Sequence, residues 1–200
     1  MMIEALRRGE FVSDDIFDTI YPGAVRSVSP FQWTPVVVAA KAARALVAEP
    51  GARVLDIGCG PGKFCFVGAL TTSGAFFGIE QRQHLVEQAE AIRCDYNIQR
   101  VSFMHGNMVD LDWAAYNAFY MFNPFFENIS DFSRIDCSIP TCRLSYERYV
   151  ATVQLKLEAQ PIGTRVAIYQ GFGGDMPKSY RLRSREVTGS DFLNLWVKYR

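Results

Sequence analysis

Short apolar runs alternate along the chain with segments in which apolar residues recur every three or four positions. A run bounded by turn residues is typical of a strand, whereas the longer spacing is typical of a helix. The pattern predicts strands at 53–57, 75–79, 101–104, 117–122, 164–170 and 192–199. It predicts helices at 36–47, 62–70 and 83–93, and a further helix through the apolar positions between 146 and 157.

This alternation of strands and helices predicts the α/β class. We expect a Rossmann-like three-layer sandwich, in which a mostly parallel seven-stranded sheet with an antiparallel last strand is covered by helices on both faces. In such sheets ligands bind beyond the carboxyl ends of the strands. Candidate functional residues are therefore sought where each predicted strand ends.

The extended segment at 178–185 supplies the remaining strand and carries alternating positive charges. Strand alternation would place Arg181, Arg183 and Arg185 on one face. We favour a solvated edge strand protected by positive charge. A track for an acidic substrate or a nucleic acid is the alternative.

The first 34 residues show no clear period and contain turn signals at Tyr21-Pro22-Gly23 and Ser29-Pro30. We therefore divide the chain into an N-terminal segment, 1–34, and a domain, 35–200. Thr34 followed by Pro35 predicts the N-cap and first position of a helix. The residues 31–35 are a candidate lid over a ligand site, and a helix cap with an anchoring tryptophan is the alternative.

The composition suits one compact domain, since 49% of the 200 residues are hydrophobic. Basic and acidic residues both number 21, and this balance argues against non-specific binding to phosphate backbones. The five cysteines form no C-x-x-C pair and only two histidines are present, so we expect no metal site. We expect mostly buried, reduced thiols, no signal peptide and no membrane span, which together favour a cytoplasmic location.

A glycine-rich turn follows the first predicted strand and opens a helix. Gly58, Gly60 and Gly62 allow a tight turn and a close approach of the backbone to a ligand, with helix N–H groups facing it. A dinucleotide fingerprint of the form G-x-G-x-x-G requires glycine at position 63, which is Lys63 here. The observed pattern is G-x-G-x-G, preceded by the acidic residue Asp56.

The second predicted strand is followed by Glu80, whose carboxylate can accept hydrogen bonds from two ribose hydroxyls. With this residue and the glycine turn, the chain resembles the class I methyltransferases, which use S-adenosylmethionine. The resemblance implies a set of cofactor-binding residues. Asp56, Gly58, Cys59, Gly60 and Gly62 would hold the methionine part, Glu80 the ribose, and Gln81, Asn107 and Met108 the adenosine end.

The loop after the fourth predicted strand begins Asn123-Pro124-Phe125. It resembles the Asn-Pro-Pro-aromatic motif of family members that methylate amino groups, with Phe125 replacing the second proline. The resemblance implies that Asn123 and Pro124 accept hydrogen bonds from the acceptor nitrogen while an aromatic ring walls the site. A loop whose aromatic residues pack under the sheet is the alternative. For Glu127 we favour a solvated loop carboxylate, and a catalytic base is the alternative.

The leading hypothesis is a methyltransferase acting on nitrogen in a protein side chain or a small amine. A methyltransferase of RNA or DNA bases is the second hypothesis. An oxidoreductase that uses NAD is a third, against which Lys63 argues, and a cofactor-binding protein without catalysis is a fourth. We expect no membrane partner and leave the acceptor unidentified.

Overall fold

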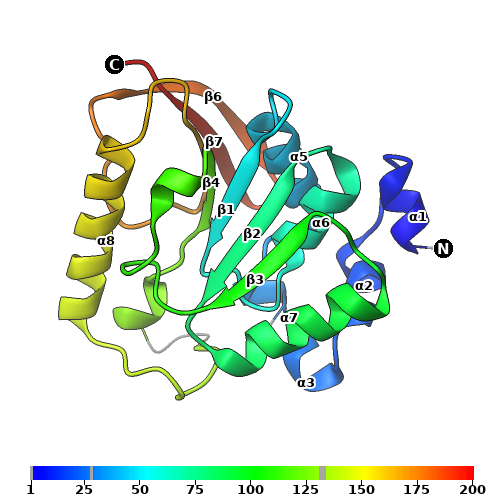
Figure 1. Cartoon of the computed structure of the whole chain (residues 1–200). Coiled ribbons are helices and arrows are strands. Elements are labelled where there is room, and N and C mark those ends of the chain that lie inside the picture. The colour runs from blue at the N-terminus through cyan, green and yellow to red at the C-terminus, as the bar shows by residue number, and fades with distance from the viewer. Residues whose placement is uncertain (1, 28, 131–133) are drawn as a thin grey trace.

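The computed structural model describes residues 2–27, 29–130 and 134–200, and seven strands of this part of the chain form one sheet (Figure 1). The strands are β1 (Arg53–Ile57), β2 (Ala75–Glu80), β3 (Val101–His105), β4 (Ala118–Phe122), β5 (Arg165–Tyr169), β6 (Tyr180–Thr188) and β7 (Asp191–Lys198). Their order is β3-β2-β1-β4-β5-β7-β6. The first five are parallel, and β7 is antiparallel to both of its neighbours. The predicted fold class is therefore confirmed.

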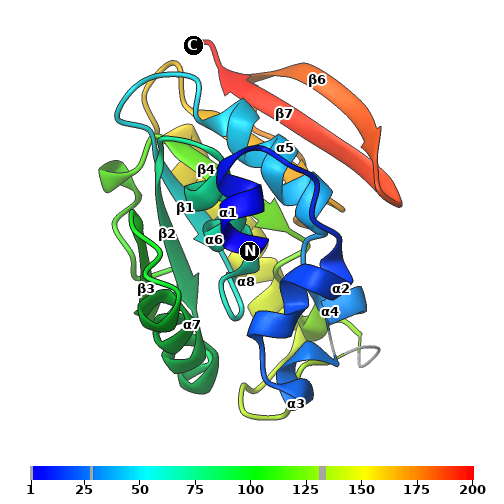
Figure 2. The same ribbon diagram turned by 90° about the vertical axis from the view of Figure 1, so that its right-hand side faces the viewer.

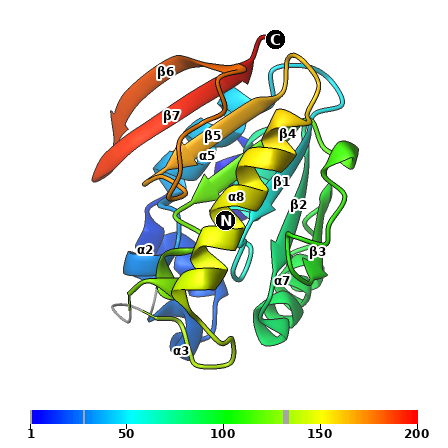
Figure 3. The ribbon, with the colours of Figure 1, turned by 90° about the vertical axis from the view of Figure 1, so that its left-hand side faces the viewer.

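Helices cover both faces of this sheet. The four longer ones are α5 (Val36–Leu46), α6 (Lys63–Thr71), α7 (Gln83–Asp95) and α8 (Arg143–Glu158). Figure 2 shows α5 and α6 on one face, and Figure 3 shows α8 on the other. Successive strand residues face opposite layers, so Val54 packs in the core with α5 and α6 while Leu55 packs in the core with α8.

The six strands predicted from apolar runs are all present, and each end differs from its predicted position by no more than one residue. The helix predicted at 83–93 continues to Asp95, and the last helix begins at Arg143. Within the described residues, no helix has the length and apolar character that a membrane crossing requires.

Strand β6 is the edge of the sheet, as the positive charges indicated. Its register against β7 shifts between Leu182 and Ser184, so Arg183 is the additional residue of a β-bulge. The additional residue reverses the alternation of side chains, and Arg181 and Arg185 therefore lie on opposite faces. The prediction that the three arginines share one face is wrong.

The N-terminal segment folds into short helices, the first of which packs against α6 (Figure 2). These are α1 (Met2–Arg7), α2 (Asp14–Phe17), the 3₁₀ turn η1 (Asp18–Ile20), α3 (Gly23–Arg26) and α4 (Ser29–Gln32). Phe17, Tyr21 and Trp33 are buried in the same core as α5 and α6. The Lys63 ammonium, with a side chain only 3% exposed, ion-pairs with Asp18 at 2.7 Å and with Asp14 at 2.6 Å. The segment is thereby fixed to the first residue of α6.

The predicted N-cap at Thr34 is wrong. Pro35 has an extended backbone and occupies the cap position of α5, while the Thr34 hydroxyl is hydrogen-bonded to the Tyr120 hydroxyl at 2.8 Å. The carboxylate of Asp14 instead accepts a hydrogen bond from the Val36 N–H at 2.9 Å. A tertiary contact thus satisfies the helix terminus that a local side chain was expected to cap.

The cysteines also differ from expectation. Cys59 and Cys65 are buried, whereas Cys94, Cys137 and Cys142 are exposed. Most of the thiols therefore lie at the surface.

Gly62 offers a direct test of the glycine turn. Its φ is +86°, and a Cβ atom there would lie 2.5 Å from the ring of Phe103. We expect Gly62→Ala to lower the free energy of unfolding by about 2–4 kcal/mol, because a left-handed alanine and a steric clash both cost stability. The control is Gly163→Ala, at a φ of +93° with no atom within 4 Å, which we expect to cost about 1–2 kcal/mol from the backbone alone. Urea unfolding measures both, and equal losses would contradict the packing role of Gly62.

Candidate active site

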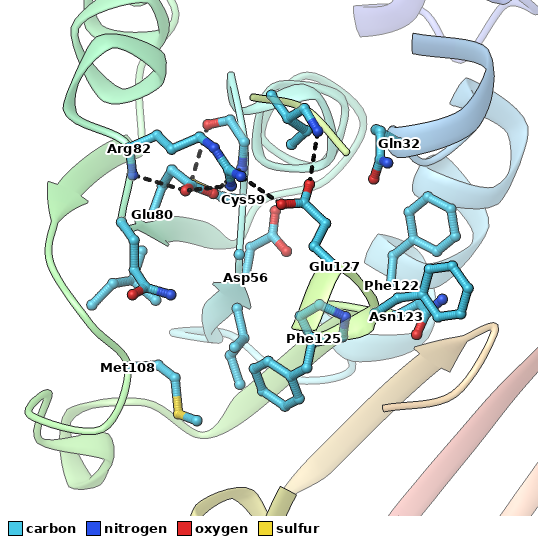
Figure 4. Close-up of a pocket in the computed structure, with 18 of the residues that line it drawn as sticks. Gln32, Asp56, Cys59, Glu80, Arg82, Met108, Phe122, Asn123, Phe125 and Glu127 are labelled. Atoms are coloured by element: carbon cyan, nitrogen blue, oxygen red, sulfur yellow. Dashed lines mark hydrogen bonds and ion pairs between the residues drawn. The ribbon is translucent and has the colours of Figure 1, made fainter. Parts of the chain in front are cut away.

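A cavity of about 460 Å³ opens beyond the carboxyl ends of β1, β2 and β4. The glycine turn, the loop after β4 and the end of the N-terminal segment all contribute to its walls (Figure 4). The predicted residues that line it are Asp56, Gly58, Cys59, Gly60, Glu80, Gln81, Met108, Asn123, Pro124 and Phe125. Gly62 and Asn107 are not among the lining residues.

The glycine turn is held by the end of β2. Gly58, Gly60 and Gly62 all have positive φ, at +74°, +53° and +86°. The N–H groups of Gly58 and Cys59 both donate to the carbonyl of Ile79, at 3.0 and 3.1 Å. Gly62 does not face the cavity but is the N-cap residue of α6, so its role is conformational.

Glu80 is buried and joins the turn to the start of α7. Its Oε2 accepts a hydrogen bond from the Gly60 N–H at 3.1 Å, and its Oε1 accepts one from the Arg82 N–H at 2.9 Å. Each carboxylate oxygen has a second acceptor site. Because the residue also lines the cavity, it can still receive two hydroxyl donors.

A polar group lies at the side of the cavity formed by β2 and α8. The Gln81 Oε1 accepts from the Asn107 amide at 3.2 Å and from the Tyr149 hydroxyl at 3.3 Å. The Asn107 side-chain oxygen accepts from the Val109 N–H at 3.0 Å. Asn107 therefore orients Gln81 and Tyr149, both of which line the cavity, while Met108 lines it directly.

The loop after β4 lies against the glycine turn. Asn123 has a φ of +41°, and its N–H donates to the Gly171 carbonyl at 3.0 Å. A Cβ atom at Gly58 would lie 3.3 Å from the Cβ of Pro124, so the two motifs are in close contact. The ring of Phe125 is 5% exposed and packs 5.2 Å from that of Tyr149, so it belongs to the core as well as to the cavity wall.

The chain is similar to known methyltransferases in sequence over one segment and in fold. Residues 48–133 match the model of a methyltransferase domain. TrmN from Thermus thermophilus shares the fold with a TM-score of 0.63 and 17% identity, over 86% of this chain and 51% of that one. An RNA methyltransferase from Salinibacter ruber, solved with S-adenosyl-L-homocysteine, has a TM-score of 0.60 and 16% identity. The match covers 83% of this chain and 93% of that one. The 16S rRNA methylase RmtB has a TM-score of 0.59 and 14% identity, and the match covers 98% of this chain and 72% of that one.

The matched segment is less than half of the chain, and the chain shares its fold with solved methyltransferases. The ligand of the Salinibacter protein, S-adenosyl-L-homocysteine, is what S-adenosylmethionine becomes after it gives up its methyl group. At such identities the solved structures show the fold alone, and the chain spans about half the length of the Thermus protein. No curated protein sequence matches the chain.

The residues around the cavity fit S-adenosylmethionine. The glycine turn, the Glu80 carboxylate and the Asp56 carboxylate all border one cavity. Asp56 is 4% exposed and accepts a weak hydrogen bond from the Cys65 thiol at 3.7 Å. Burial raises the pKa of Asp56 to about 8, against the lowering effect of the Cys65 hydrogen bond and with a further rise from the charge of Glu80. A cationic ammonium would stabilise the ionised form.

Several lining residues were missed or misread from the sequence. Arg82 directly precedes α7 and Tyr149 lies on α8. Both line the cavity, and no local motif marks either one. Tyr120 was assigned only to a strand, yet it lines the cavity and its ring stacks on Phe64 at 3.8 Å. Glu127 is not solvated, because it ion-pairs with Arg82 at 2.5 Å.

Histidine, cysteine and carboxylate side chains in the described ranges form no group of three that could bind a metal.

The buried Asp56 predicts a pH-dependent stability. In the folded protein without cofactor this group stays protonated up to about pH 8, whereas in the unfolded chain it ionises near its ordinary value of 3.8. The unfolded state therefore binds fewer protons across this window. Stability should fall as pH rises from about 4 to about 8, by up to about 1.4 kcal/mol per pH unit from this group.

The substitution Asp56→Asn removes this titration. The difference in unfolding free energy between Asp56→Asn and the unmodified protein should grow in favour of the variant as the pH rises. Chemical unfolding of the cofactor-free proteins measures it, with Asp95→Asn as an exposed control. Parallel pH profiles of the unmodified protein and Asp56→Asn would refute the raised pKa.

Proposed function

We propose that this domain transfers a methyl group from S-adenosylmethionine to a nitrogen atom, and that Asn123 orients the acceptor. The observation that carries this proposal is the contact between the glycine turn and the loop after β4. Pro124 packs against Gly58, and Asn123 lines the same cavity as Asp56 and Glu80. A cofactor at the turn and an acceptor at the loop would therefore share one cavity.

The backbone of Asn123 supports a positioning role. Its left-handed φ is tolerated better by asparagine than by most residues, and its N–H bond to Gly171 fixes the peptide. The hydrogen bonds among described residues do not use its side-chain amide. This amide, which borders the cavity, is thus available to a ligand.

When bound, the cofactor supplies an electrophilic methyl group on a sulfonium. Transfer to nitrogen is an in-line displacement that depends on orientation and exclusion of water. The side-chain oxygen of Asn123 and the carbonyl of Pro124 accept the N–H groups of the acceptor, which directs its lone pair and stabilises the charge that develops on nitrogen. A neutral amine needs no base for this step.

The remaining residues hold the cofactor. Glu80 accepts the ribose hydroxyls, and Asp56 balances the ammonium of the methionine part. Gln81 and Met108 contact the adenosine end, while Asn107 acts through Gln81. These roles combine the family resemblance with the positions of the side chains in the cavity.

The N-terminal segment serves as a fixed wall of the site. Gln32, Trp33 and Thr34 line the cavity. Trp33 is buried and its ring lies 4.6 Å from that of Tyr21, while Thr34 is hydrogen-bonded to Tyr120. These contacts favour a wall that is part of the domain over a lid that closes on a hinge.

A protein side chain or a small amine is the acceptor we favour. Methylation of a nucleic-acid base is the second candidate, because two of the proteins with a similar fold are named as RNA methyltransferases. The zero net charge and the bulge that separates Arg181 from Arg185 weigh against it.

The role of Asn123 is tested by two substitutions. We expect Asn123→Ala and Asn123→Gly to lower turnover by about 10²-fold, because each removes the acceptor-orienting amide. Cofactor affinity should stay unchanged. The glycine variant is the control for backbone strain, since it accepts the left-handed φ. Turnover like that of the unmodified protein in Asn123→Gly would rule out a side-chain role.

The acceptor is tested with a labelled methyl group. The purified protein is incubated with methyl-labelled S-adenosylmethionine and a cell extract, and the label is counted in protein, nucleic acid and small molecules. We expect label in the protein or small-molecule fraction. Label confined to nucleic acid would instead support the second candidate, and the Asn123→Ala protein serves as the blank.

A further inference from the structure

Arg82 joins three acidic side chains, two of which, Glu80 and Glu127, are seen beside it in Figure 4. Its guanidinium lies 2.5 Å from Glu127, 3.1 Å from Asp136 and 3.8 Å from Glu80. The Arg82 side chain is only 8% exposed. Two of these carboxylates come from the region after β4, and the third is the proposed ribose ligand.

Arg82 offsets the repulsion within this cluster. Its guanidinium faces three carboxylates, and His84 lies 3.3 Å from Asp136. The side chains of Glu80 and Glu127 are 7% and 15% exposed, so removal of the guanidinium would leave both carboxylates without its compensating charge. Arg82 therefore favours an arrangement in which the three carboxylates lie near one another.

The cluster also determines where two walls of the cavity lie. Glu127 follows the Asn123 loop, and its Oε1 accepts a hydrogen bond from the Ile135 N–H at 3.1 Å. Ile135 and Ile139 both line the cavity. Asp136, between them, is the residue that Arg82 contacts through Nε. Arg82 thus connects the cavity wall at 135–139 with Glu80.

We propose that Arg82 is a positioning residue that couples cofactor binding to the formation of the acceptor site. By holding Glu127 and Asp136 against Glu80, it places the loop after β4 and the wall at 135–139 beside the bound cofactor. This inference rests on the proposed function. Arginine suits the role because its planar guanidinium presents donors to several carboxylates at once, which the lysine ammonium matches less well.

The test measures binding of S-adenosylhomocysteine by calorimetry. We expect Arg82→Gln to weaken binding at least about tenfold and Arg82→Lys to weaken it less. Glu127→Gln should weaken it severalfold. The double variant Arg82→Gln/Glu127→Gln should bind about as well as Arg82→Gln alone, because the two residues act as one unit. The control is Arg93→Gln, which breaks a surface pair with Glu90 at 2.6 Å and should not change affinity.

Two results distinguish a positioning role from a general loss of stability: tighter binding in Arg82→Lys than in Arg82→Gln, and non-additive effects in the double variant. A general loss of stability would lower the melting temperature and produce neither result. If Arg82→Gln does not fold, Arg82→Lys and Glu127→Gln decide the question. If the folded Arg82 variants keep the same affinity for S-adenosylhomocysteine, or if the two substitutions have strictly additive effects on it, the role of Arg82 is overturned while the proposed function stands. Failure of the unmodified protein to bind S-adenosylhomocysteine would instead overturn the proposed function.

Discussion

The hydrogen bond from the Gly60 N–H to the Glu80 carboxylate connects the two loops on which the site depends. It requires the left-handed turn that only glycine adopts easily, and it places a buried carboxylate beside the backbone N–H groups of Gly60 and Arg82. Pro124 packs on Gly58, and Arg82 pairs with Glu80, so the acceptor loop and its supporting wall take their positions from this same contact. The geometry of the active site is therefore set by backbone conformation before any ligand binds.

A second anchor lies behind the turn. Lys63 stands where a dinucleotide-binding turn would have glycine, and its side chain borders the cavity while it ion-pairs with the N-terminal segment. The buried ammonium binds Asp18 and Asp14, and Asp14 also accepts from the N–H that begins α5. One position thus fixes both the N-terminal segment and the wall that Trp33 contributes.

The fold and the central motif could be predicted from the sequence, because each depends on local pattern. Apolar runs located every strand near the site, and the spacing of Asp56, the glycines and Glu80 indicated the cofactor. The bulge at Arg183 and the pairing of Glu127 with Arg82 could not be predicted, since they arise between segments far apart in the chain. Asn107 shows the intermediate case, where the motif pointed to the right region but the side chain faces its neighbours.

The central claim is that this turn with its carboxylate binds S-adenosylmethionine rather than a dinucleotide. Calorimetric titration of the unmodified protein with S-adenosylmethionine and, separately, with NAD tests it most directly. The account predicts saturable one-to-one binding of S-adenosylmethionine and no binding of NAD. Binding of NAD without binding of S-adenosylmethionine would contradict it.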